Sequence, residues 1–132
     1  MTTPDTTRRI VEAYFSAWTA KSVDEAYALL AEDLEFSGPT TSYRSADEFR
    51  PALVNFAAMT KEARVAELVV QDDRAAVLYD CELPPPVGRL RIASFFRVEN
   101  GKIRWYETLF DATELRKLLA SKREGNEPSD PH

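Results

Sequence analysis

Residues 95–106 read Phe-Phe-Arg-Val-Glu-Asn-Gly-Lys-Ile-Arg-Trp-Tyr, and this stretch decides the fold. The pair Asn100–Gly101 separates two runs that are rich in aromatic and β-branched residues. Asparagine and glycine accept the positive φ angles of a two-residue hairpin turn. The stretch therefore predicts two long antiparallel strands, 89–99 and 102–110.

Two further strands are expected upstream of this hairpin. The runs 63–71 and 75–83 are also rich in Val and Leu, and the short polar segment 72–74 separates them. The loop 84–88 begins with three consecutive prolines and ends with a glycine. Proline donates no backbone hydrogen bond, so this loop is expected to form a wider turn between the second and third long strands.

The first part of the chain predicts a helix with one apolar face. Apolar residues recur there at three- and four-residue spacing: Ile10, Val11, Tyr14, Phe15 and Trp18. This spacing is that of one face of an α-helix, and the face is expected to pack against the sheet.

Capping patterns mark three more helix starts. Residues 22–25 and 45–48 both match a capping box, and 111–114 caps a closing helix. A short strand is expected at 34–37. Pro51 lies inside the helix that follows 45–48, so a kink or a displaced start is expected there.

Helices followed by a meander of long strands predict an α+β domain, in which the N-terminal helices cover one face of a curved, mainly antiparallel sheet. A length of 132 residues suits one domain. We expect residues 8–120 to form this domain, between a flexible N-terminus at 1–7 and a disordered polar tail at 121–132.

Composition excludes several classes of function. A net charge of −5 without a basic stripe argues against nucleic acid as a partner. Neither a membrane span nor a signal peptide is expected. The lone cysteine, Cys81, cannot form an internal disulfide, so a cytoplasmic location is expected. The single histidine is His132 in the polar tail, which argues against histidine catalysis and a zinc site. No cofactor or metal is implied.

Three stretches of the chain carry a family resemblance: 10–18 (IVEAYFSAW), 28–36 (ALLAEDLEF) and 95–103 (FFRVENGKI), which runs on to 110–111. They resemble the nuclear transport factor 2-like superfamily, which includes ketosteroid isomerases, limonene-epoxide hydrolases and SnoaL-like polyketide cyclases. The similarity covers nearly all of 8–119. It implies a cone-shaped, cystatin-like fold with a deep apolar pocket, and a homodimer through the outer face of the sheet. This fold hosts enzymes and binding modules alike.

The resemblance to the ketosteroid isomerases extends to one of three chemical groups. Their first-helix tyrosine falls at Tyr14, but their base falls at Gly38 and their oxyanion-hole acid at Ser94. Glycine cannot take a proton, and serine is a far weaker donor than a protonated carboxylic acid. Steroid isomerase activity is therefore not expected.

The resemblance to the epoxide hydrolases also preserves one group of three. One catalytic aspartate falls at Asp80, whereas the arginine falls at Leu78 and the second aspartate at Thr108. The single aspartate of the cyclases finds only a poor match at Glu107 and Thr108. Asp80 is thus the best candidate for chemistry, because an apolar pocket would raise the pKa of its carboxyl.

The sequence leaves open which way Asp80 points. Strand alternation groups it with Leu78 and Glu82 on the more polar side, which sends it outward. The resemblance, together with pairing across the hairpin to Leu90, Ile92 and Ser94, sends it inward.

The expected pocket is largely aromatic, and its ligand is therefore expected to be a small apolar or flat organic molecule. Tyr14 is expected to donate a hydrogen bond to this ligand. The other expected lining residues are Trp18, Phe36, Tyr43, Phe49, Phe56, Leu78, Ser94, Phe96, Tyr106, Thr108 and Phe110. Trp105 alternates with Tyr106, and an outward Trp105 would suit a dimer interface.

Two hypotheses about function follow. In the first, the chain is a SnoaL-like small-molecule-binding protein that acts as an isomerase, cyclase or hydrolase, with Asp80 transferring a proton and Tyr14 donating a hydrogen bond. In the second, the same cone is a ligand carrier or a dimeric accessory domain without catalysis. The missing acids at Gly38 and Ser94 favour the second, and the retained Tyr14 and Asp80 favour the first.

Overall fold

The computed structural model describes residues 2–125, and Met1 and residues 126–132 lie outside the described part. The elements in chain order are α1 (Pro4–Thr19), α2 (Val23–Tyr27), β1 (Leu30–Ser37), β2 (Ser42–Tyr43), α3 (Ala46–Met59), β3 (Glu62–Gln71), β4 (Arg74–Glu82), β5 (Arg89–Glu99), β6 (Lys102–Leu109) and α4 (Thr113–Gly125).

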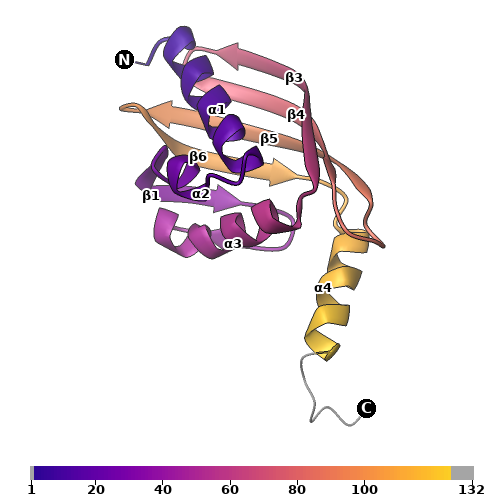
Figure 1. The fold of residues 1–132 in the computed structure, drawn as a ribbon. Coiled ribbons are helices and arrows are strands. Elements are labelled where there is room, and N and C mark those ends of the chain that lie inside the picture. The colour runs from indigo at the N-terminus through magenta and orange to yellow at the C-terminus, as the bar shows by residue number, and fades with distance from the viewer. Residues whose placement is uncertain (1, 126–132) are drawn as a thin grey trace.

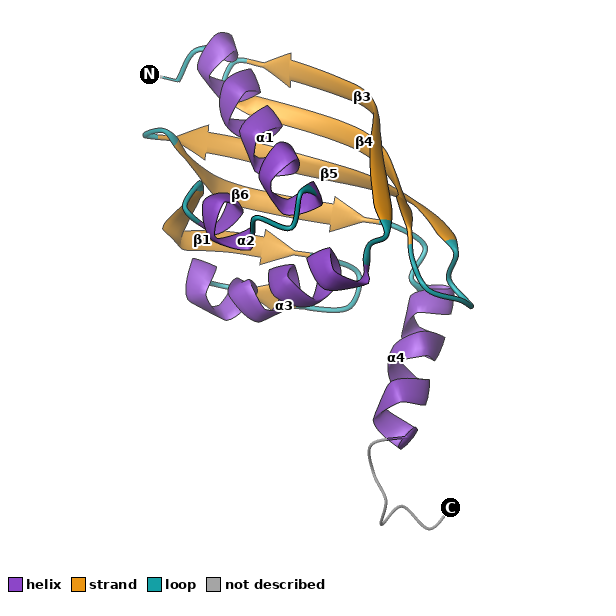
Figure 2. Cartoon of the chain, viewed as in Figure 1, coloured by secondary structure: helices purple, strands orange, loops and turns teal. Residues whose placement is uncertain are grey.

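One curved sheet of six strands forms the body of the molecule, in the order β2-β1-β6-β5-β4-β3. Neighbouring strands are antiparallel except β1 and β6, which run parallel. Helices α1, α2 and α3 lie on the concave face of this sheet (Figures 1 and 2). The predicted α+β architecture, with N-terminal helices on a mainly antiparallel curved sheet, is confirmed.

The hairpin that decided the fold is present as predicted. Asn100 and Gly101 have φ angles of 52° and 79°, the left-handed conformation that a tight turn between β5 and β6 requires. The four long strands begin and end within one residue of the predicted bounds. The first strand differs from the prediction. It begins at Leu30, which pairs with Ile103 of β6, rather than at residue 34.

The first helix begins earlier than expected. The Thr3 hydroxyl accepts a hydrogen bond from the Thr6 amide, and Pro4 occupies the first turn, where a missing N–H costs nothing. Thr7 is buried, and its hydroxyl donates to the Asp72 carbonyl at 2.6 Å. Residues 4–7, expected to be flexible, are therefore helical and tied to the turn between β3 and β4.

The two predicted capping boxes behave differently. Ser45 accepts a hydrogen bond from the Glu48 amide at 3.1 Å, as a capping serine should. Ser22 precedes α2, but its side chain makes no capping hydrogen bond. The start of α3 is not displaced by Pro51, which lies exposed inside the helix that begins at Ala46.

The closing helix α4 projects away from the sheet (Figure 1). The Asp111 carboxylate accepts a hydrogen bond from the Thr113 amide, and this bond lowers the pKa of Asp111. Leu115 is buried, and the Arg116 guanidinium donates to the Pro39 carbonyl at 2.9 Å. Of the tail expected from residue 121, residues 121–125 continue α4 and the remainder lies outside the described residues.

The core lies between the helices and the concave face. The buried side of α1 presents Tyr14, Phe15 and Trp18, and the strands present inward residues at alternate positions. Fully burying one large apolar side chain stabilises the fold by about 1.5–3 kcal/mol. This core also forms the walls of the cavity described next.

Candidate functional site

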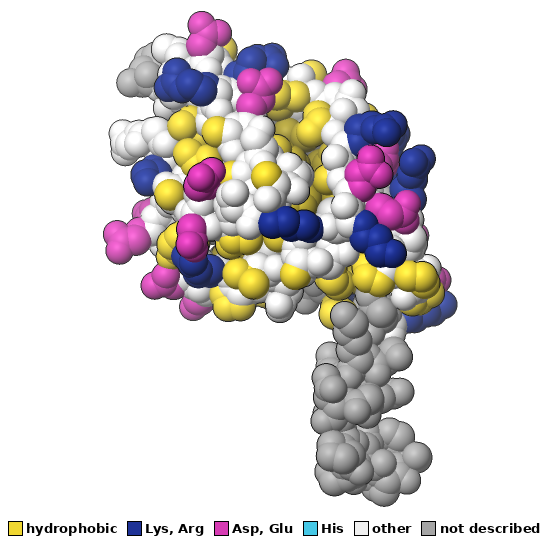
Figure 3. All heavy atoms as spheres, in the orientation of Figure 1, with side chains coloured by type: hydrophobic (Ala, Val, Ile, Leu, Met, Phe, Trp, Pro, Cys, Tyr) yellow, Lys and Arg dark blue, Asp and Glu magenta, His cyan; other side chains and the backbone are white. Residues whose placement is uncertain are grey.

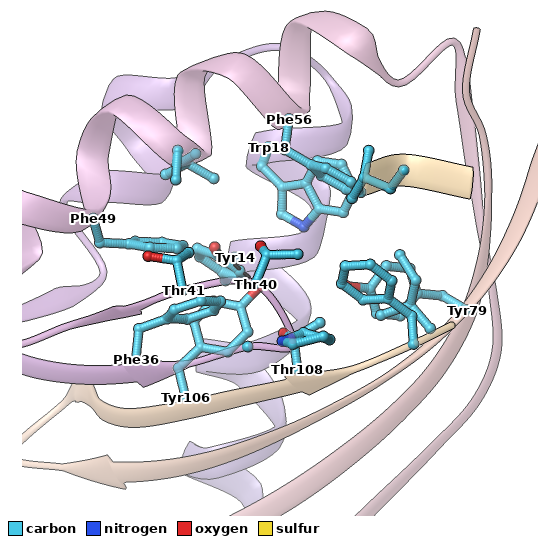
Figure 4. Close-up of a pocket in the computed structure, with 17 residues that line it drawn as sticks. Tyr14, Trp18, Phe36, Thr40, Thr41, Phe49, Phe56, Tyr79, Tyr106 and Thr108 are labelled. Atoms are coloured by element: carbon cyan, nitrogen blue, oxygen red, sulfur yellow. Dashed lines mark hydrogen bonds between the residues drawn. The ribbon is translucent and has the colours of Figure 1, made fainter. Parts of the chain in front are cut away.

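An apolar cavity of about 130 Å³ lies at the concave face of the sheet (Figure 4). The surrounding residues come from α1, β1, α3, β4, β5, β6, the loop 38–41, the segment between β6 and α4, and the start of α4. They are Tyr14, Trp18, Phe36, Gly38, Pro39, Thr40, Thr41, Phe49, Ala52, Leu53, Phe56, Tyr79, Ile92, Tyr106, Thr108, Phe110 and Leu115.

Helix and strand periodicity explain why these side chains converge. Tyr14 and Trp18 are four residues apart, so both lie on the same face of α1. Tyr106 and Thr108 are two residues apart on β6, so both point to the concave face. These four residues line the cavity, and so do the other expected lining residues Phe36, Phe49, Phe56 and Phe110.

Aromatic packing holds one wall of the cavity. Phe36 and Phe49 stack with ring centroids 4.5 Å apart, and Tyr106 meets Phe36 edge-on at 5.0 Å. Edge-to-face and offset pairs of this kind add about 0.5–1.5 kcal/mol each beyond their buried area.

Five buried hydroxyls form the polar part of the site. Ser94 Oγ shares hydrogen bonds with the hydroxyl of Tyr79 at 3.1 Å and that of Thr108 at 2.9 Å. The Tyr14 hydroxyl donates to the Tyr106 hydroxyl over a longer 3.4 Å. Each of the five hydroxyls therefore has another hydroxyl as a neighbour.

Burial keeps the three tyrosines neutral. Desolvation is the largest cause of the pKa increase for each phenol, and it raises the pKa of Tyr106 to about 12. It also raises the pKa values of Tyr14 and Tyr79 well above the ordinary range, with neighbouring tyrosines adding to the effect. At neutral pH these phenols can donate hydrogen bonds but cannot act as bases.

Asp80 lies outside this cavity, contrary to the inward orientation that the resemblance implied. It pairs in register with Arg91, and Tyr79 and Cys81 on either side of it are buried. Alternation therefore places the Asp80 carboxylate on the outer face, where the Arg91 guanidinium binds it. Hydrogen bonding to Arg91 lowers the pKa of Asp80, the opposite of the increase expected in an apolar pocket.

Four other predicted lining residues take different positions. Leu78 lies on the outer face with Asp80, for the same reason of alternation. Ser94 is fully buried behind the wall, where it connects Tyr79 and Thr108. Phe96 packs in the core against Tyr106, with ring centroids 4.5 Å apart. Tyr43 packs behind Phe36 and Phe49.

Sequence reasoning missed part of the lining. Tyr79 and Ile92 are not among the expected lining residues. Both are buried and lie opposite each other in the β4–β5 register, which places them together at the concave face. The loop 38–41 lines the cavity because of the path of its backbone. The Gly38 amide donates a hydrogen bond to the Thr41 carbonyl, and the resulting turn lies over the cavity. No residue pattern signals such a contribution.

A second hollow lies between α1 and the edge strand β3. Figure 3 shows hydrophobic atoms in the furrow on the helix-bearing face. Val65 and Leu68 form its sheet side, and Arg8 and Glu12 stand at its helix side. Val65 is 47% exposed, so this hollow is an open groove rather than an enclosed site.

Two further observations bear on the class of protein. Within residues 2–125, no three His, Cys, Asp or Glu side chains are grouped so as to hold a metal ion. None of the described helices has the length and apolar character that crossing a membrane requires.

Solved structures resemble the whole fold. A protein from Kribbella flavida is 25% identical with a TM-score of 0.80, over 93% of this chain and 98% of that one. An epoxide hydrolase from M. tuberculosis, described as similar to LEH, is 19% identical with a TM-score of 0.70, over 92% and 98%. A nuclear transport factor 2-like protein from Cytophaga hutchinsonii is 18% identical with a TM-score of 0.71, over 86% and 94%.

The family comparison is more specific than these structural likenesses. A search of curated proteins finds no significant match. The sequence pattern of the SnoaL-like domain, however, matches residues 11–106, which include the second half of α1, the first five strands and most of β6. The chain is a member of the SnoaL-like domain family, and its fold is that of nuclear transport factor 2-like proteins.

Proposed function

We propose that this protein binds a small, uncharged, largely apolar organic molecule in the cavity and is a binding module rather than an acid–base enzyme. One observation carries the proposal. Among the described residues that line the cavity, none has a carboxylate, imidazole, amine, guanidinium or thiol.

The lining sets the charge of the ligand. Burying an ionised group without a partner of opposite charge is very costly, and the cavity offers only hydroxyl, indole and backbone groups. Carboxylates, phosphates and ammonium ions are therefore poor ligands. Aromatic walls favour a ring or a compact branched hydrocarbon.

The cavity volume limits how much of the ligand can be enclosed. A dry apolar cavity of about 150 Å³ in another protein binds benzene. The present cavity of about 130 Å³ thus suits a single six-membered ring, and a larger molecule would extend past the loop 38–41.

The position of Asp80 disfavours the enzyme hypothesis. Isomerases and hydrolases of this fold need a base that reaches the substrate. The Asp80 carboxylate is on the opposite face of the sheet, held by Arg91, and the phenols of the cavity are not bases at neutral pH. A carrier or accessory role needs only the cavity.

Filling the cavity tests the proposal. Ala52 lines the cavity from α3, whereas Ala58 is exposed on the same helix. Ala52→Phe should abolish binding of methylenecyclohexane, measured by saturation-transfer NMR, and Ala58→Phe should leave it unchanged. Equal binding by both variants, or none by the unsubstituted protein, contradicts the proposal.

We also propose that the outer face of the sheet forms a homodimer interface. The outer-face patch consists of Val69, Leu78, Phe95 and Leu109, and three of these are substantially exposed, at 53% for Val69, 37% for Phe95 and 50% for Leu109. Leu78 and Leu109 both pair with Ala93, which makes the patch continuous across three strands. Contiguous apolar patches of this kind mark interaction surfaces.

A further inference from the structure

The indole nitrogen of Trp18 is the unusual polar atom of the cavity. Trp18 is 2% exposed, and its Nε1–H finds no acceptor among the residues that the structure describes. No other buried side-chain nitrogen or oxygen in this part of the chain shares that condition. A buried donor left without an acceptor is destabilising, so native proteins seldom keep one without a use.

The orientation of the indole points to that use. Figure 4 shows the nitrogen of Trp18 facing the open space between Thr40, Tyr14 and Tyr79. The ring cannot readily turn elsewhere, because Phe15, Phe56 and Tyr79 surround it with centroid distances of 5.8, 5.6 and 6.2 Å. The donor is thus fixed toward the position that a ligand would occupy.

The buried hydroxyls are already occupied with one another. Tyr79, Ser94 and Thr108 form one hydrogen-bonded chain, and Tyr14 bonds to Tyr106. A hydroxyl can both donate and accept, but an indole N–H can only donate. The hydrogen-bonding group that the cavity lacks is therefore an acceptor for the Trp18 indole N–H.

We infer that the ligand carries an uncharged hydrogen-bond acceptor, a carbonyl oxygen on a compact hydrocarbon ring, which accepts from Trp18 Nε1–H. This inference rests on the proposed binding function and narrows it to cyclic ketones and related carbonyl compounds. Trp18 is then the residue that selects such molecules from hydrocarbons of the same shape.

Two probes of matched shape test the inference on the full chain. Cyclohexanone and methylenecyclohexane have the same ring, and they differ in an exocyclic oxygen against a CH₂ group. Isotope-labelled protein gives two indole N–H resonances, from Trp18 and Trp105, and Trp105→Phe on the outer face assigns them. Both probes should bind, but only cyclohexanone should move the Trp18 indole proton downfield, as a new hydrogen bond does.

The affinity of a variant provides the second measurement. Trp18→Phe removes the same wall contacts from both probes. Cyclohexanone binding should therefore weaken about five- to tenfold more than methylenecyclohexane binding does, which is the loss of one hydrogen bond. If Trp18→Phe does not fold, the resonance shift in the unsubstituted protein decides alone. Binding of both probes with equal indole shifts overturns the inference and leaves the proposed function standing. Binding of neither probe overturns both.

Discussion

Arg91 holds Asp80 by two hydrogen bonds across the β4–β5 pair, from Nε to Oδ1 at 3.0 Å and from Nη2 to Oδ2 at 2.9 Å. This fork binds both carboxylate oxygens, the geometry in which arginine recognises carboxylates best. The pair lies on the outer face and lowers the pKa of Asp80. The carboxylate therefore remains ionised at neutral pH, turned away from the cavity.

Asp80→Asn should leave ligand binding unchanged and lower stability in a pH-dependent way. The folded-state pKa of Asp80 is depressed, so its contribution to stability is present at neutral pH and is lost as the pH falls below about 4. Urea unfolding should show the variant less stable than the unsubstituted protein at neutral pH and equally stable in acid. Glu82→Gln, on the same face of β4, is the control and should change little. Loss of methylenecyclohexane binding in Asp80→Asn would show that the carboxylate serves the cavity.

Ser94→Ala should destabilise the fold by about 1–3 kcal/mol, because Ser94 connects two buried hydroxyls that would lose a shared partner. Thr108→Val removes the end of the same chain and leaves Ser94 bonded to Tyr79, so its cost should be smaller. The free energies of unfolding in urea measure both. A Thr108→Val variant that is the less stable of the two would contradict this view of the chain.

The Cys81 thiol should be inert in the folded protein. It is buried, and desolvation raises its pKa to about 12. Dithiodipyridine should label it rapidly in denaturing urea and far more slowly in the native state near neutral pH, since the thiolate is the reactive form.

The same raised pKa predicts a loss of stability in alkali. The unfolded chain ionises its thiol above about pH 8.5, whereas the folded chain does not until about pH 12, so the stabilisation present below the lower value declines between the two. Cys81→Ala should remove that part of the alkaline decline. An identical decline in this variant would assign it to other groups, such as the buried tyrosines.

Phe95→Arg should separate the proposed dimer. Phe95 is central in the outer-face patch, between Ala76 of β4 and Glu107 of β6, and two copies of a new arginine would bring like charges into an apolar contact. Light scattering at micromolar concentration should show a dimer for the unsubstituted protein and a monomer for the variant. Arg74→Glu, an exposed change at the first residue of β4, should remain dimeric. A monomeric unsubstituted protein would refute the interface.

The sequence predicts the architecture well because local signals agree with one another. The Asn100–Gly101 turn, the strand composition and the apolar spacing of α1 each specify their element, and the structure contains all of them. The parallel pairing of β1 with β6 has no such local signal, since it depends on contacts between Leu30 and Ile103, far apart in the chain.

The facing of Asp80 shows why the site was harder to predict than the fold. Pairing Asp80 with Leu90 or Ile92 would turn it inward, but the actual partner is Arg91, one residue away from either. A shift of one residue in register moves every side chain of a strand to the other face. The alternation of Tyr79 and Cys81 with Asp80 indicated the correct face, and the family resemblance indicated the wrong one.

The parallel seam between β1 and β6 also affects how the chain can be made. β1 ends at Ser37, yet its ladder partner Glu107 is synthesised seventy residues later, 107 minus 37. Until β6 emerges from the ribosome, β1 has no strand that connects it to β5, β4 and β3. The part of the cavity wall formed by β1 and α3 cannot yet pack against those strands. The sheet therefore cannot form strand by strand as the chain is synthesised. We expect the native state to form only after the C-terminal quarter of the chain has been made.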